Sequence, residues 1–443
     1  MENSTLVFCG SSADFLNAEL AAQSNAENGG IAFRKPSLIN ANGTLVAVAD
    51  RASSGEGWGY IELAVRRSVD GGKSWTPVKA IASPPARETR ANASSYASAF
   101  YVDPCLAMAP NGDIIMLVNF WPECKGPHNQ QLLDRKKIPY AMCEGEMCPL
   151  IYDRDGNFYY VLESGDVLDN HKNPTDYTLR GLGELYRRGE YMGNIYLNGA
   201  MGKNEFGAKT TFGAPLKAPK RSYVFMLRSS NSGISWSEPK DVTSMLLAET
   251  DGTSVGVCAG TGLTTKDGRI VMPMYSEKGQ SFSVFSIDDG ESWHRMIRNP
   301  YAENSGEWQI VEAPDGTLLG MGTQKKYGKT PVSFSANGAK SWEKGKPTAL
   351  LAPQCQKSVL QVGDYVLCSH PSGTERVDGV ITVGKLRRVG GRFTHIDWFR
   401  DIVVNDGFFG YSCLAKINDK TIGIIYESQP SSYIEFKSFS LDF

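Results

Sequence analysis

A short motif that occurs four times along the chain constrains its fold more than any other feature. The copies occupy Ser68–Trp75, Ser229–Trp236, Ser286–Trp293 and Ser335–Trp342. Each begins with Ser and ends with Trp, and most carry Asp or Asn in third place and Gly in fifth place. Asp, Asn and Gly tolerate the positive φ of a tight turn, and short polar side chains can bond the local backbone. Each copy therefore predicts a β-turn whose closing Trp packs between neighbouring sheets.

The spacing of the copies predicts a repeated sheet. The last three copies begin at 229, 286 and 335, roughly 50 to 60 residues apart, which is typical of one four-stranded propeller blade per repeat. The gap from Ser68 to Ser229 is about three times as long. We expect a blade without the motif, together with an inserted segment, in that gap.

Composition narrows the function classes. A chain of 443 residues with 41% hydrophobic content can bury a large core, but it exceeds the usual single domain unless it is built from repeats. A net charge of −2 gives no reason to expect binding to nucleic acid or membranes. The longest apolar runs are too short for a transmembrane helix. The first residues lack the basic region of a signal peptide, and the compartment stays open: secreted, periplasmic or cell-surface if a leader was removed, otherwise cytoplasmic.

Cysteine and histidine usage gives no sign of a metal site. The nine cysteines contain no Cys-x-x-Cys pair, and the five histidines show no ligand spacing. Cys143 with Cys148, and Cys105 with Cys124, could form disulfides, but free cysteines are the favoured interpretation. We expect no metal, no cofactor and a monomer.

The start of the first predicted blade carries the clearest family signal. Phe33-Arg34-Lys35-Pro36 resembles the Phe-Arg-Ile-Pro signature of the sialidase family, glycoside hydrolase family 33, and the turn motifs resemble its Asp boxes. The resemblance runs from about residue 30 to the C-terminus, and it is strongest to the bacterial branch with a small β domain inserted in the catalytic propeller. It implies an all-β, six-bladed β-propeller over residues 31–443.

Two segments depart from regular blades. Residues 1–30 are expected to form an N-terminal arm or a partial strand that closes the propeller, with Asp14–Gln23 as a candidate short helix. Residues 125–225 break the blade spacing, and both this and the resemblance predict an inserted β segment there. A disordered linker over Asn198–Lys220 is the alternative for its last part.

The resemblance also implies an active site. Sialic acids carry a carboxylate on the anomeric carbon, which would repel a carboxylate nucleophile, whereas a neutral Tyr activated by Glu would not be repelled. By resemblance Tyr411 is the nucleophile and Glu307 its activating base. Without the resemblance, Tyr411 would be interpreted as a core aromatic residue and Glu307 as an exposed loop acid.

The remaining roles concern the sugar and its carboxylate. Planar guanidinium groups suit a carboxylate, and the resemblance implies this role for Arg34 and Arg376, with Glu427 holding Arg34 in place. Arg51 and Asp103 match residues that contact the sugar. Surface salt bridges are the alternative for the arginines. Trp121 and Trp308 are candidates for an apolar wall, although core packing is the better interpretation for each.

Two departures from the family pattern bear on function. The second arginine of the family is absent after Glu307, and Gln324 or Lys325 lies in its neighbourhood. The position of the acid/base Asp is Gly57, so the adjacent Glu56 is the candidate acid/base, with an ordinary surface Glu as the equal alternative.

The sequence therefore predicts a retaining exo-glycosidase that releases a terminal sialic acid or a related ulosonic acid from sialoglycans, with atypical specificity or transfer as a consequence of the departures. The alternatives are a catalytically weak or inactive sialidase-like carbohydrate-binding propeller, and a propeller scaffold for protein assembly. Linkage preference and acyl substituent are not predicted.

Overall fold

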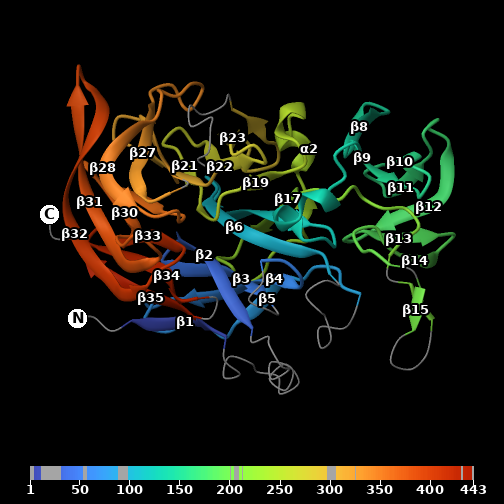
Figure 1. Ribbon diagram of the computed structural model, residues 1–443, viewed down its shortest axis with the longest axis horizontal. Helices are drawn as coiled ribbons and strands as arrows, with labels where there is room; N and C mark the ends of the chain where they lie inside the picture. The colour runs from blue at the N-terminus through green and yellow to red at the C-terminus, as the bar shows by residue number, and fades with distance from the viewer. Residues whose placement is uncertain are drawn as a thin grey trace.

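The computed structural model describes residues 4–10, 31–52, 57–87, 98–199, 201–203, 209–211, 213–296, 306–324, 326–430 and 433–441. Within these ranges the protein is built almost entirely of strands, arranged as six blades around a common axis (Figure 1). Within the same ranges, no helix has the length and apolarity needed to cross a membrane. The candidate helix at Asp14–Gln23 lies outside the described residues.

The first three blades contain strands in the order of the chain, apart from one interruption. Blade one consists of β2 (Ala32–Ala41), β3 (Thr44–Ala52), β4 (Ile61–Ser68) and β5 (Lys79–Ala82). Blade two consists of β6 (Phe100–Met108), β7 (Ile114–Trp121), β17 (Tyr223–Ser229) and β18 (Lys240–Asp241), with β20 (Gly260–Thr261) parallel to β6. Blade three consists of β19 (Val255–Val257), β22 (Ile270–Ser276), β23 (Ser281–Ser286) and β24 (His294–Arg295), with β21 (Leu263–Thr264) against β22.

The last three blades complete the ring. Blade four consists of β25 (Trp308–Glu312), β26 (Leu318–Gly322), β27 (Gly328–Ser335) and β28 (Lys346–Ala352). Blade five consists of β29 (Ser358–Val362), β30 (Tyr365–Pro371), β31 (Val377–Val389) and β32 (Arg392–Phe408). Blade six consists of β33 (Ser412–Asn418), β34 (Thr421–Gln429), β35 (Tyr433–Ser440) and β1 (Thr5–Cys9), so that the first strand of the chain pairs with the last.

A second sheet is inserted between β7 and β17. After two short helical turns, η2 (Gly126–His128) and η3 (Gln130–Leu132), the chain forms a seven-stranded antiparallel sheet of β8 (Tyr140–Cys143), β9 (Glu146–Tyr152), β10 (Phe158–Val161), β11 (Asp166–Leu168), β12 (Pro174–Arg180), β13 (Glu184–Arg187) and β14 (Glu190–Asn194). A hairpin of β15 (Met201–Lys203) and β16 (Lys209–Thr211) follows. In Figure 1 this region lies beside the propeller, away from both termini. Its apolar residues continue the core of blades one and two.

This topology corrects one expectation. Among the described residues between Ser68 and Ser229 there is no blade without the motif, because the second copy follows β17, the third strand of the interrupted blade two. The insertion alone lengthens the gap. A helix α2 (Thr243–Leu246) and a turn η4 (Glu249–Asp251) then lead from blade two to blade three.

The four motifs form the same hydrogen-bonded turn between the third and fourth strands of blades one to four. In the third copy, Ser286 Oγ donates to Asp288 Oδ1 (2.7 Å) and accepts from the Gly290 backbone N–H (2.8 Å). Asp288 Oδ1 also accepts from the Ser292 backbone N–H (2.9 Å). The other copies repeat these bonds.

The closing Trp residues pack between blades, as the motif predicts. Trp75 meets the edge of Phe436 from blade six, with ring centres 5.6 Å apart. Trp293 lies in the core shared by blades two and three, and Trp342 packs on a cluster that spans blades three and four. All nine cysteines are free, so neither candidate disulfide forms.

Candidate active site

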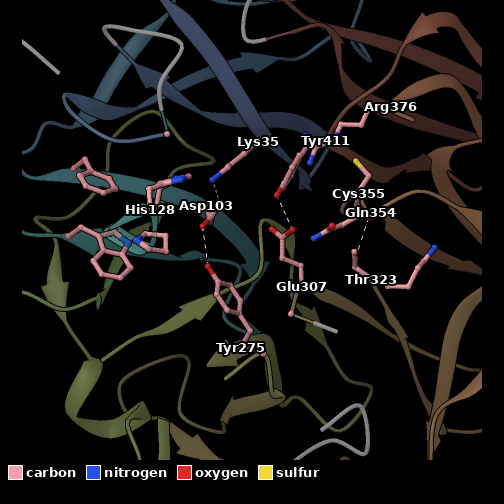
Figure 2. A pocket seen from close by; sticks show the side chains of 18 residues that line it. Lys35, Asp103, His128, Tyr275, Glu307, Thr323, Gln354, Cys355, Arg376 and Tyr411 are labelled. Carbon is pink, nitrogen blue, oxygen red and sulfur yellow. Dashed lines mark hydrogen bonds and ion pairs between the residues drawn. The ribbon is translucent and has the colours of Figure 1, made fainter. Parts of the chain in front are cut away.

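A cavity of about 330 Å³ brings together side chains from distant parts of the chain (Figure 2). Its walls carry two positive and two negative side chains together with several aromatic ones. The lining residues are Lys35, Gly57, Phe100, Val102, Asp103, Trp121, Pro127, His128, Tyr275, Gly279, Gly306, Glu307, Thr323, Gln324, Gln354, Cys355, Arg376 and Tyr411. A space of this size matches the lower end of ordinary ligand pockets.

Tyr411 and Glu307 form the central pair of the cavity. Each lies one residue before the first strand of a blade, Tyr411 before β33 and Glu307 before β25. The Tyr411 phenol donates to Glu307 Oε2 at 2.8 Å, although the two residues are 104 positions apart. Tyr411 is only 9% exposed, and it packs on Ala259 and Cys355. The phenol proton therefore has a defined acceptor within a single short hydrogen bond.

The electrostatics of this pair favour proton exchange. Burial raises the pKa of Glu307 to about 7, and the nearby Asp103 carboxylate adds to the shift. Lys35, the Tyr411 hydrogen bond and Arg376 act in the opposite direction. Burial also raises the pKa of Tyr411, and the charges of Glu307 and Asp103 raise it further. The ground state is thus a neutral phenol next to a carboxyl group that is ready to bind a proton near neutral pH.

Glu427, from β34, fastens two sides of the site. Its Oε1 accepts the Lys35 backbone N–H at 2.9 Å and lies 3.7 Å from Arg34 Nε. Its Oε2 accepts the Tyr411 backbone N–H at 3.2 Å. A Cβ on Gly410 would lie 2.1 Å from Glu427 Oε2, so only glycine lets the carboxylate approach this closely. Arg34 and Tyr411 are therefore held by the two oxygens of one buried carboxylate.

Lys35 and Asp103 form an ion pair inside the cavity. Lys35 Nζ lies 2.6 Å from Asp103 Oδ1 and 5.9 Å from the centre of the Tyr411 ring. Burial lowers the pKa of Lys35, but the charges of Asp103 and Asp50 outweigh it and raise the pKa overall. Tyr275 Oη and Asn119 Nδ2 donate to Asp103 Oδ2, at 3.5 Å and 2.9 Å.

Both members of this ion pair lie at bulges in their strands. The register of β2 against β3 shifts between Arg34 and Ser37, and that of β6 against β7 shifts between Val102 and Cys105. Lys35 has a φ of 53° and Asp103 a φ of 64°, a left-handed conformation that is rare for residues other than glycine. Such conformations cost of order 1–3 kcal/mol each and gather at functional sites. The bulges turn both side chains into the cavity.

Arg376 and Gln324 both line the cavity. The Arg376 guanidinium carbon is 5.4 Å from the centre of the Tyr411 ring, and its backbone carbonyl accepts the Phe409 N–H at 2.8 Å. Gln324 lines the cavity, but its amide nitrogen donates to backbone carbonyls and its Oε1 accepts from the buried Lys357 (3.2 Å). Gln324 is thus already engaged in holding the wall.

Several of the predicted residues are not part of the observed cavity lining. Arg51 pairs with Glu62 at 3.2 Å, and neither it nor Arg34 is among the described residues that line the cavity. Glu56 and Lys325 lie outside the described residues. Trp121 lines the cavity beside Phe100, whereas Trp308 is buried in the core, where its indole N–H donates to Met274 O at 2.9 Å.

Comparisons with known proteins agree with this picture. A model of the BNR repeat-like domain matches residues 207–403. The anhydrosialidase of Macrobdella decora is 25% identical over 448 residues, which cover 90% of this chain and 58% of that protein. The intramolecular trans-sialidase from Ruminococcus gnavus, solved with oseltamivir carboxylate, superposes with a TM-score of 0.78 at 22% identity and covers 99% of this chain and 97% of its own. The chain is thus similar to sialidases over most of its length, and it shares their fold.

A sialidase of Bacteroides fragilis is also 25% identical, over 223 residues that cover 46% of this chain and 39% of that protein. The chain thus spans less than two thirds of the length of the curated relatives it matches. The six-bladed propeller expected from the family signature and the turn motifs is confirmed.

The sialidase-family signature did not reveal every residue of the cavity. Lys35 stands inside the motif that carried the resemblance, but nothing in the sequence indicated that a bulge turns it toward Asp103. Tyr275, His128 and the adjacent Gln354 and Cys355 have no sequence signal, because they come from three separate segments of the chain. Within the described part of the chain, no three His, Cys, Asp or Glu side chains gather in a set that could hold a metal ion.

Proposed function

We propose that the protein is a retaining exo-glycosidase of the sialidase type, with Tyr411 as the nucleophile and Glu307 as its base. The observation that carries the proposal is the 2.8 Å hydrogen bond from the Tyr411 phenol to Glu307 inside the cavity. Its substrates are glycans that end in a sialic acid or a related ulosonic acid.

The reaction has two steps. In the first, the Tyr411 oxygen bonds to the anomeric carbon while its proton passes to Glu307. The bond from that carbon to the aglycone oxygen breaks, and the aglycone oxygen keeps the electron pair and takes a proton from a general acid. In the second, the oxygen of an acceptor bonds to the anomeric carbon and gives its proton to the same acid/base group, while the bond to Tyr411 breaks and Glu307 returns its proton to the Tyr411 oxygen. A neutral phenol avoids the repulsion that the substrate carboxylate would impose on an anionic nucleophile.

Positive charge for the substrate carboxylate comes from three side chains. Arg376 lies beside the Tyr411 ring. Arg34 lies against Glu427, the residue that also accepts the backbone N–H of Tyr411. Lys35 adds a third cation within the cavity of a chain that lacks the family's second arginine. An ammonium group offers a point charge rather than a planar fork, so we expect the carboxylate to be held less specifically than by three arginines.

The acceptor in the second step is either water or a hydroxyl of the bound sugar itself. The relatives described above include an anhydrosialidase and an intramolecular trans-sialidase, which supports transfer as well as hydrolysis. Mass spectrometry of the released sugar distinguishes the two, because intramolecular transfer gives a product lighter by one water.

The test is turnover of a 4-methylumbelliferyl sialoside. We expect Tyr411→Phe to abolish it and Glu307→Gln to reduce kcat/KM roughly 10²- to 10⁴-fold. The exposed Tyr327→Phe is the matched control and should retain full activity. A fluorinated sialoside that traps the glycosyl-enzyme should label the peptide with Tyr411. Full activity of Tyr411→Phe would refute this mechanism.

A sialidase-like carbohydrate-binding propeller is the second candidate, and the glycine at position 57 favours it because the family acid/base is missing there. This function predicts binding of free sialic acid, seen by saturation-transfer NMR, without turnover of the aryl sialoside. If the protein shows neither binding of sialic acid nor turnover, the remaining candidate is a propeller scaffold for protein assembly.

A further inference from the structure

The cavity contains a histidine, His128, to which the two steps above assign no role. We propose that His128 is the general acid/base of this site, standing in the space that the missing side chain of Gly57 leaves open. This inference rests on the proposed glycosidase function. His128 lies at the start of the inserted region, and Gly57 lies in the loop before β4.

The geometry of Gly57 carries the proposal. Gly57 and His128 both line the cavity. A Cβ added to Gly57 would lie 2.7 Å from His128 Nε2, 3.3 Å from its Cε1 and 3.6 Å from its Cδ2. Real Cβ atoms do not approach other atoms as closely as 2.7 Å, so a side chain at position 57 and this imidazole compete for one space. In this arrangement the imidazole occupies the space next to the Gly57 backbone that a side chain at position 57 would take.

The imidazole packs against one aromatic ring, and the backbone of its turn is fixed. The Trp58 indole lies against it with ring centres 4.9 Å apart. His128 ends η2, where its backbone N–H donates to Lys125 O at 3.1 Å. Gly126, with a φ of 52°, brings this turn so close to the cavity floor that a Cβ there would lie 3.0 Å from Phe100 and 3.3 Å from Trp121. The turn is thus seated on the apolar wall.

The location suits proton transfer to a leaving group. In Figure 2, His128 lies on one side of the cavity and Arg376 on the other, with Glu307 and Tyr411 between them. A sugar whose carboxylate faces Arg376 directs its other anomeric substituent toward the side of His128. The His128 residue is also exposed, so its ring can exchange protons with water between turnovers.

The chemistry balances in both steps. When the bond from the anomeric carbon to the aglycone breaks, its electron pair goes to the aglycone oxygen, which takes the proton from His128 Nε2. In the second step Nε2 takes a proton from the acceptor as the acceptor oxygen bonds to the anomeric carbon. Histidines ordinarily titrate at about 6.5, which suits a group that must both give and receive a proton near neutral pH. A protonated imidazole also does not repel the substrate carboxylate.

The first test compares two leaving groups. A phenol such as 4-methylumbelliferone departs without a proton, whereas the sugar alcohol of 3′-sialyllactose needs one. We expect His128→Gln to lower kcat/KM on 3′-sialyllactose roughly 10²- to 10⁴-fold and to change it less than about tenfold on the aryl sialoside. His171→Gln, an exposed histidine of the inserted sheet, is the control and should change neither.

Three results would overturn the assignment. They are equal losses on both substrates, no loss on either, and a selective loss in Glu56→Gln while His128→Gln behaves as wild type. If the wild-type protein turns over neither substrate, the proposed function itself fails, which separates that failure from failure of this inference alone.

A positional swap provides an independent test. His128→Gly removes the ring, and Gly57→Asp in that background places a carboxyl group in the vacated space, with no positive φ at Gly57 to strain the new residue. We expect the double variant to recover at least about tenfold of the 3′-sialyllactose activity that His128→Gly loses. Turnover of the aryl sialoside shows that both variants fold. Undiminished sialyllactose activity in His128→Gly would refute the proposal.

Discussion

Glu307 illustrates how the fold can hold one side chain away from its ordinary protonation state. An unfolded chain leaves this carboxyl near its ordinary pKa of 4.5, whereas the folded protein raises it to about 7. Because the folded pKa is the higher one, Glu307 does not destabilise the fold below pH 4.5. As the pH rises from 4.5 to about 7, the unfolded chain releases its proton first and the folded state loses stability. Each unit of pKa shift corresponds to about 1.4 kcal/mol.

The first prediction follows from this sign. Glu307→Gln keeps an acceptor for Tyr411 but removes the titration, so we expect it to be more stable than wild type by roughly 1–3 kcal/mol at pH 8 and about equal at pH 4. Urea unfolding at the two pH values measures the difference. The exposed Glu343→Gln serves as the control and should show no such dependence. An equal gain at both pH values would contradict the assignment of the shift to Glu307.

The second prediction concerns activity at the same residue. Glu307 must be ionised to accept the Tyr411 proton, so kcat/KM on the aryl sialoside should rise with pH and level off above about 7. We expect the rise of kcat/KM to follow the loss of a single proton, because the aryl leaving group does not need a general acid. A pH profile measured in constant ionic strength checks this. A limb centred below pH 5 would show that the base of the free enzyme is not this carboxyl.

At the scale of the element, the turn motif acts as a small hydrogen-bonded unit. Ser286 is buried, and its hydroxyl is the acceptor for the Gly290 backbone N–H. Asp288 then ties the Ser hydroxyl to the Ser292 backbone. The same three bonds at four places explain why the motif tolerates Asn for Asp, since both offer the same side-chain oxygen.

The third prediction tests this unit. Ser286→Ala leaves the Gly290 N–H without its acceptor in a buried position, which should lower the free energy of unfolding by about 1–3 kcal/mol. The neighbouring Ile287 is 67% exposed, so Ile287→Ala should stay within about 0.5 kcal/mol of wild type. Chemical denaturation of both variants gives the comparison. Equal stability of the two would mean that the hydroxyl does not hold the turn.

At the scale of the whole molecule, the ring is closed by the pairing of its two ends. β1 pairs with β35, so residues near the N-terminus complete the last blade. Phe8 of β1 is fully buried, and its ring centre lies 5.1 Å from that of Phe33, the residue before Arg34. The contact between Phe8 and Phe33 therefore helps to close the ring. It also supports the backbone next to Arg34, a predicted carboxylate-binding residue.

The fourth prediction concerns this closure. Phe8→Ala should lower the free energy of unfolding by about 3–5 kcal/mol, because it leaves a cavity between β1 and β2. It should also raise KM for the aryl sialoside, since Phe33 and Arg34 lose their support. Leu6→Ala, at a position 44% exposed in the same strand, is the control for both measurements. An unchanged KM in Phe8→Ala would contradict this prediction, because it would show that ring closure does not affect substrate binding.

The insertion shows how the whole molecule supplies the site. It enters blade two between β7 and β17, and its first turn carries His128 to the cavity before the seven-stranded sheet begins. The expected blade without a motif was wrong for the same reason, because spacing along the chain does not reveal whether extra residues stand between blades or inside one.

The sequence by itself determined the local features of this protein. The four turns could be predicted because their hydrogen bonds join residues two to four positions apart, and the family signature pointed to Tyr411, Glu307 and Glu427, whose roles stay predictions. Only the tertiary structure decided what surrounds them. Lys35 meets Glu427 across 392 positions and Tyr411 meets Glu307 across 104, and such contacts exist only once the ring has closed. The contact between His128 and Gly57 is likewise decided by the tertiary structure. It depends on where the insertion leaves blade two, and not on the neighbours of either residue in the chain.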